Sequence, residues 1–198
     1  MKEYLVLLFA LVFVQNFVLS QFLGICPFIG VSKKRDSAIG MGMAVIFVMG
    51  VSCFVTMLVY KLLLVPYNLQ NYLDIMSFIL IIAALVQFVE IVMKKVAPPL
   101  YQALGIYLPL ISTNCAVLGS TQMKVAEWAD LSLAEALLKS TCLGIFGGIG
   151  FTLALYLMAA IRERLESAPI PAGLRGIPIA FIAAAGMALS FFAFTGII

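Results

Sequence analysis

The chain has 198 residues, of which 64% are hydrophobic and only 11% are charged. A soluble domain of this size is usually about half apolar and about one quarter charged, so the composition predicts an integral membrane protein. The absence of histidine excludes histidine-bound haem or zinc and a Ser-His-Asp triad. The net charge of +3 does not indicate binding to nucleic acid, because the basic residues lie at the ends of apolar segments rather than on one face.

Six segments are predicted to cross the bilayer as α-helices, since a spanning helix needs roughly 20 apolar residues. The uncharged runs are 4–32, 37–60, 75–89, 96–123, 140–161 and 176–198. The third run is short, but Glu90 and Lys94, four residues apart, can pair at a helix end and extend it to about residue 93. A further uncharged stretch, 62–73, is short, contains Pro66, Asn68, Gln70 and Asn71, and is expected to form a loop.

The orientation follows from the basic residues in the short loops. Eight of them lie in the odd-numbered loops, which join spans 1 and 2, 3 and 4, and 5 and 6: Lys33, Lys34, Arg35, Lys94, Lys95, Arg162, Arg164 and Arg175. The other side has four: Lys2, Lys61, Lys124 and Lys139. This asymmetry predicts that the odd-numbered loops are cytoplasmic and that both termini lie on the outer face of a bacterial inner membrane. The first span has no A-x-A site and is expected to stay uncleaved.

The two cysteines of the first half of the chain recur at one constant spacing in the second half. Cys26 and Cys115 are 89 residues apart, and so are Cys53 and Cys142. With three spans in each half, a repeated half must enter the membrane from the opposite side. We therefore expect one membrane domain made of two inverted three-helix repeats, 1–95 and 96–198.

The first and fourth spans are the longest, and both contain helix breakers. Gly24 and Pro27 flank Cys26, while Gly105, Pro109 and Asn114 precede Cys115. Irregular backbone at membrane depth survives only where it is buried in protein or lines a cavity. Both spans are therefore predicted to be interrupted near a thiol.

Two roles are possible for the four cysteines. A lone cysteine in an apolar helix is often a small hydrophobe, which is the role expected for Cys53 and Cys142. Iron–sulfur clusters commonly take four thiolates, so Cys26 and Cys115, together with two thiolates from a similarly folded partner, could hold a [2Fe–2S] cluster. Among the polar residues within spans, Gln15, Asn16 and Gln87 are expected to bridge helices by hydrogen bonds. Glu90 is expected to be an interfacial ion pair, with ion handling as the alternative.

Several strings resemble the Rnf and Nqr membrane subunits. They are 16–19 (NFVL), 22–34 (FLGICPFIGVSKK), 104–119 (LGIYLPLISTNCAVLG), 161–165 (IRERL) and 173–176 (GLRG). The resemblance covers essentially the whole chain and is greatest to the Rnf A branch, because of the strings 26–28 (CPF) and 40–42 (GMG). Gln15 departs from the pattern, which has an asparagine there. The Nqr E branch, from the sodium-translocating NADH:quinone reductase, is the alternative.

The resemblance implies a function. Members of the Rnf A branch pair with a homologous E-type subunit of opposite orientation, with which they share an intramembrane [2Fe–2S] cluster, and Cys26 and Cys115 would contribute to it. Further partners would be the B, C, D and G subunits and membrane lipid. The chain would relay electrons between ferredoxin, NAD and flavins of other subunits, coupled to sodium or proton translocation, with no flavin or catalytic site of its own. The competing classes are a secondary transporter and a purely structural subunit.

Overall fold

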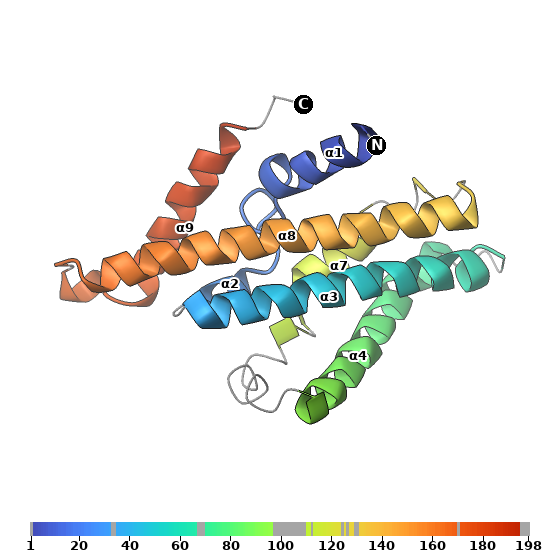
Figure 1. Cartoon of the computed structure of the whole chain (residues 1–198), viewed down its shortest axis with the longest axis horizontal. Coiled ribbons are helices and arrows are strands. Elements are labelled where there is room, and N and C mark those ends of the chain that lie inside the picture. Colours follow the sequence, from blue (N-terminus) through green and yellow to red (C-terminus); the bar gives the residue numbers. More distant parts are fainter. Residues whose placement is uncertain are drawn as a thin grey trace.

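A computed structural model describes residues 2–32, 35–66, 70–96, 110–111, 113–123, 125, 127–128, 131–169 and 171–194. The regular secondary structure in this part of the chain is helical (Figure 1). In chain order they are α1 (Lys2–Phe9), η1 (Ala10–Val14, π-helical), α2 (Ile25–Val31), α3 (Arg35–Val59), η2 (Tyr60–Leu64, π-helical), α4 (Gln70–Val96), α7 (Cys115–Gln122), α8 (Leu133–Glu166), η3 (Ala172–Leu174, 3-10) and α9 (Ile177–Phe192).

Three described helices are long and apolar enough to cross a membrane, namely Arg35–Leu64, Asp74–Val92 and Leu133–Glu166. They correspond to the second, third and fifth predicted spans. Two shorter apolar helices, Tyr4–Val14 and Ile177–Phe192, lie within the first and sixth. Most of the fourth predicted span precedes α7 and is outside the described residues, so the complete six-helix arrangement stays a prediction.

The predicted loop at 62–73 is wrong at both ends. The helix that begins as α3 continues through η2 to Leu64, and the next helix already begins at Gln70. Polar residues are compatible with the first turn of a helix, where backbone N–H groups lack intrahelical partners. Pro66 follows the last turn, as expected of a residue that cannot continue a helix. At its other end α4 continues past Lys94 to Val96, which confirms the predicted extension beyond Glu90.

The core of the molecule is an antiparallel pair of helices, α3 and α8, which lie side by side along the molecule (Figure 1). Glycines on α8 bring the two backbones together. A Cβ added to Gly144 would lie 2.5 Å from the carbonyl oxygen of Met49, and one added to Gly148 would lie 2.7 Å from the Cα of Ile46. Small residues at such spacing are typical of membrane helix pairs, in which close backbone approach provides the packing energy. We call this contact the glycine seam.

Side-chain contacts also join α3 and its continuation to α8 or the segment before it, at both ends of this pair. At one end Arg35, at the start of α3, forms an ion pair with Glu163 near the end of α8. At the other end the Nζ of Lys61 donates a hydrogen bond to the carbonyl oxygen of Leu131, just before α8. Loops that are predicted to lie on the same side of the membrane are therefore found at the same end of the helix pair. The direction of the whole chain across the bilayer stays a prediction.

Helices α4 and α9 flank the central pair (Figure 1), and both have apolar side chains that are exposed. On α4, Phe78 and Ile82 are buried, whereas Leu80 is 72% exposed. On α9, Met187 is buried and Leu189 is 75% exposed. Large apolar surfaces of this kind mark contact with a membrane or a partner protein, as expected for helices at the rim of a membrane protein.

Candidate functional site

The first apolar segment breaks after η1, and a buried asparagine stabilises the break. The Nδ2 of Asn16 donates to the carbonyl oxygens of Val12 at 3.0 Å and of Gly150 in α8 at 2.8 Å. Its Oδ1 accepts from the backbone N–H groups of Val18 at 3.0 Å and Leu19 at 3.3 Å. This one side chain therefore satisfies backbone groups that the interrupted helix leaves free. It confirms the predicted bridging role of Asn16, whereas Gln15 and Gln87 have exposed side chains.

The chain re-enters a helix at Gly24, which immediately precedes α2. Gly24 has a φ of +79°, a conformation that costs other residues roughly 1–2 kcal/mol. A Cβ at this position would lie 2.7 Å from the Oδ1 of Asn114 and 2.9 Å from the Cε2 of Phe151. Only glycine fits here without strain, and its absent side chain lets the start of α2 lie directly against the start of α7.

Asn114 is the N-cap residue of α7. Its Oδ1 accepts a hydrogen bond from the backbone N–H of Ala116 at 3.0 Å, which satisfies one of the free donors at this helix start. Its Nδ2 is buried and has no hydrogen-bond partner among the described residues. Two residues that were identified from the sequence only as helix breakers, Gly24 and Asn114, thus touch each other.

The contact between these caps brings the first and second halves of the chain together at their cysteines. Cys26 is the second residue of α2, and Cys115 is the first residue of α7. Both side chains are exposed and neither forms a disulfide. Two thiols therefore lie in the first turns of two helices whose starts are in contact, where a neighbouring protein can reach them.

The other two cysteines have different surroundings. Cys53 lies in the glycine seam and is fully buried, and its Sγ is 3.6 Å from the Oγ of Ser120. Cys142 is half-buried within the uninterrupted helix α8. The shared spacing of 89 residues thus relates two pairs of cysteines in unlike environments: one pair is exposed at helix starts and the other lies within long helices.

The far end of α2 is held by a basic residue of α8. The Nη1 of Arg162 donates to the carbonyl oxygen of Ile29 at 2.7 Å and to the Oγ of Ser32 at 2.9 Å. A cation at a helix C-terminus satisfies free carbonyl groups and is favoured by the helix dipole. The short helix that carries Cys26 is therefore fixed at both ends, by Gly24 and by Arg162. From the sequence, Arg162 is identified only as a basic residue of a loop. Its contact with Ile29 is not predicted, because no local pattern links residues 133 positions apart.

The two exposed thiols are ligands of the kind that an iron–sulfur cluster uses. Thiolates are the usual ligands of iron in such clusters, and Cys26 and Cys115 would contribute two of the four that a [2Fe–2S] cluster commonly needs. Within the described ranges, no group of three or more His, Cys, Asp or Glu residues could hold a metal ion. The two thiols fit the chemistry, and the remaining ligands would have to come from another chain.

The sequence also matches known proteins along its whole length. Residues 4–198 match the family described as Rnf-Nqr subunit, membrane protein. The chain is 50% identical over 197 residues to the A subunit of an ion-translocating oxidoreductase complex from Azoarcus sp., covering 100% of this chain and 98% of the relative. It is 51% identical over 185 residues to the A subunit of the Na⁺-translocating ferredoxin:NAD⁺ oxidoreductase complex from Acetobacterium woodii, covering 93% of each. The A subunit of an ion-translocating oxidoreductase complex from Syntrophotalea carbinolica is 48% identical over 198 residues, 100% of this chain and 99% of the relative. The resemblance found in the cysteine-bearing strings is thereby confirmed, and the chain belongs to the Rnf-Nqr family of membrane subunits.

Proposed function

We propose that this chain is the A subunit of an Rnf-type, ion-translocating ferredoxin:NAD oxidoreductase complex in a bacterial inner membrane. The support is identity of about 50% to three relatives over nearly the full length. Two are named as A subunits of ion-translocating oxidoreductase complexes and one as the A subunit of a Na⁺-translocating ferredoxin:NAD⁺ oxidoreductase complex. The names of these relatives favour the Rnf branch over the Nqr E alternative. The translocated ion is sodium or a proton; the relative from Acetobacterium woodii is named for Na⁺.

Within that complex, Cys26 and Cys115 provide two thiolates to a [2Fe–2S] cluster shared with a homologous E-type subunit. The observation that carries this proposal is the contact of Gly24 with Asn114, which brings together two helix starts that each present an exposed thiol. A pair of packing cysteines would be expected to be buried, as Cys53 is. When bound, the cluster supplies a one-electron relay between redox partners in other subunits.

The residues of this chain act by holding the two thiols in place. Asn16 fixes the interrupted backbone before α2, Gly24 allows α2 to reach α7, and Arg162 anchors the end of α2. Metal sites need ligands whose positions are set by such supporting contacts, because a loosely held thiol loses affinity for the metal. The chain relays electrons and couples them to ion movement, without a flavin or a nicotinamide site of its own.

The architecture that we propose is six transmembrane helices in two inverted repeats, 1–95 and 96–198, with both termini on the outer face. Its support is that α3 and α8, the second helices of the two halves, are antiparallel. In addition, α2 and α7 each begin beside a cysteine, after Gly24 and Asn114. A secondary transporter could share this architecture, but iron and acid-labile sulfide in the purified complex would separate a relay from a transporter.

The decisive experiment replaces each cysteine by serine in the assembled complex and records the paramagnetic resonance of the reduced cluster. Cys26→Ser and Cys115→Ser should each abolish the [2Fe–2S] signal and electron transfer, because serine keeps the size of the side chain but binds iron poorly. Cys53→Ser and Cys142→Ser are the matched controls and should retain both. A wild-type signal in Cys26→Ser, with loss of the signal in Cys53→Ser, would contradict the proposed ligands.

The same proposal predicts dependence on a partner. The isolated chain should bind no stable cluster, whereas co-expression with the homologous E-type subunit should yield one, as measured by iron and sulfide content. A cluster retained by the monomer would show that this chain supplies more than two ligands.

A further inference from the structure

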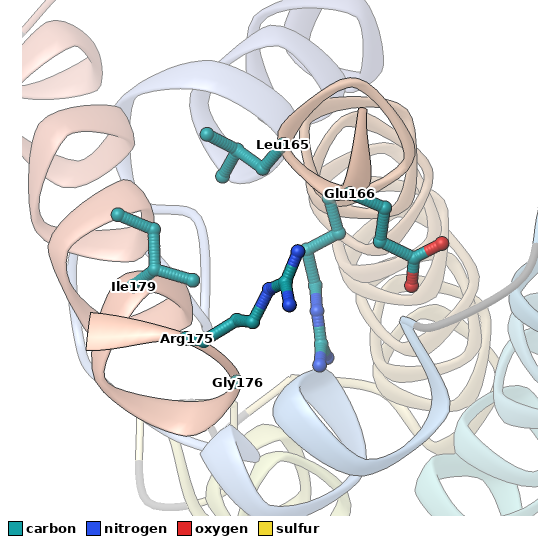
Figure 2. A pocket seen from close by; sticks show the side chains of 6 residues that line it. Leu165, Glu166, Arg175, Gly176 and Ile179 are labelled. Carbon is teal, nitrogen blue, oxygen red and sulfur yellow. The ribbon is translucent and has the colours of Figure 1, made fainter. Parts of the chain in front are cut away.

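A cavity of about 370 Å³ lies between the end of α8 and the start of α9 (Figure 2). Its lining residues are Arg162, Leu165, Glu166, Arg175, Gly176 and Ile179. This volume is within the range of small-molecule sites, roughly 300–1,000 Å³. It combines two guanidinium groups with an apolar wall, and it lies at the end of the molecule that the basic loops assign to the cytoplasmic membrane surface.

Arg162 and Arg175 both have N–H groups that donate no hydrogen bond to the described residues. The Nη1 of Arg162 donates to Ile29 and Ser32, which leaves its Nε and Nη2 groups without an acceptor among the described residues. Arg175 is exposed and has no hydrogen-bond or ion-pair partner in the described part of the chain. Figure 2 shows the Arg175 side chain extending into the cavity, whereas the carboxylate of Glu166 turns away from it. The cavity therefore offers two guanidinium charges that its own carboxylate does not neutralise, a setting suited to a phosphate group.

An apolar cleft lies beside this charged cavity, along the same helix. It separates α9 from the break in the first segment, and its lining includes Phe22, Ile29, Phe181 and Ala185. Ile29 is also the residue whose carbonyl oxygen binds Arg162, so the cleft and the cavity are adjacent. Farther along, Ala185 and Phe22 belong to a second apolar cavity of about 470 Å³. A charged cavity thus lies beside an apolar cleft at the edge of a membrane protein.

From this combination we propose that the cavity binds the phosphate headgroup of an anionic phospholipid, with an acyl chain in the cleft beside α9. Basic pockets between membrane helices on the cytoplasmic side commonly bind anionic headgroups. Free phosphate would use the guanidinium groups but leave the apolar cleft empty. A zwitterionic headgroup would bring a cation close to Arg162 and Arg175, which repels it. The lipid would also hold α9 against the break that leads to α2.

The proposal is tested on the detergent-purified complex, titrated with phosphatidylglycerol and followed by native mass spectrometry. Arg175→Gln should weaken binding of one phosphatidylglycerol about tenfold, the loss expected for a charge-assisted hydrogen bond. The control is Arg164→Gln, which removes the same charge from an exposed position outside the cavity and should leave binding unchanged. Size-exclusion chromatography checks that both variants assemble.

Three further arms identify the source of the phosphate. Phosphatidylcholine should bind at least tenfold more weakly than phosphatidylglycerol. Ala185→Phe, which fills the cleft, should weaken binding of phosphatidylglycerol, and millimolar inorganic phosphate should not displace the lipid. The proposal is overturned if Arg175→Gln binds phosphatidylglycerol like the wild type, or if phosphatidylcholine binds equally well. Displacement by inorganic phosphate, or a crosslink from position 175 to another protein of the complex with no lipid bound, would likewise overturn it.

Discussion

Replacing Gly24 by alanine should disrupt the contact on which the candidate cluster site depends. The added Cβ would lie 2.7 Å from the Oδ1 of Asn114 and 2.9 Å from the Cε2 of Phe151, and it would have to adopt a φ of +79°. The conformation costs roughly 1–2 kcal/mol and overpacking costs about 1–3 kcal/mol. The free energy of unfolding should therefore fall by about 2–5 kcal/mol. The displacement of Asn114 should also move the adjacent Cys115 and lower the cluster content of the complex.

Two measurements check this result. Unfolding of the detergent-purified chain by a denaturing detergent gives the loss of stability, and iron per assembled complex gives the occupancy of the cluster. Gly186→Ala is the matched control, because its added Cβ meets nothing within 4 Å in the middle of α9. That variant should be neutral or up to about 1 kcal/mol more stable. If Gly24→Ala were as stable as the control and kept its full iron content, the inferred packing of α2 on α7 would be refuted.

Three other predictions concern the frame around the site. Gly144→Ala places a Cβ 2.5 Å from a carbonyl oxygen of α3 and should destabilise the chain by about 1–3 kcal/mol in the same unfolding assay; an unchanged stability would contradict the glycine seam. Asn16→Asp replaces the Nδ2 donor by an oxygen that faces two carbonyl oxygens, and it should lower the free energy of unfolding by about 2 kcal/mol or more. A variant with unchanged stability would contradict the bridging role of Asn16. In intact cells, a thiol at Ser167→Cys should be protected from impermeant reagents and one at Ile198→Cys labelled; the opposite pattern would invert the topology.

Charge and hydropathy were sufficient to predict the long helices, because the cost of burying a charge in hydrocarbon applies to any sequence and depends little on tertiary contacts. They predicted the helix ends poorly. Gln70 and Asn71 look like loop residues, yet α4 begins there, since polar residues at a membrane surface are equally compatible with a helix. Hydropathy indicates where a helix can be buried but does not determine where its first turn forms.

The candidate site was predictable in its parts but not in its assembly. Gly24 and Asn114 were recognisable as helix breakers because glycine and asparagine have local conformational preferences. Their contact joins positions 90 residues apart and depends on how α3 and α8 pack, which no local pattern encodes. The same holds for Arg162, whose hydrogen bond to Ile29 joins the loop after the fifth predicted span to the first span.

The glycine seam also limits how the molecule can move during turnover. At Gly144 and Gly148 the backbone of α8 lies against that of α3, so any larger residue brought to this contact by a movement of α8 would collide with the backbone of α3. We therefore expect the two helices to keep their register and to move together. We expect displacements that accompany turnover to occur at α4 and α9, whose outer faces are exposed. Spin labels on α3 and α8 should accordingly keep one separation in the oxidised and reduced complex, while labels on α9 change theirs; a redox-dependent distance between α3 and α8 would rule this division out.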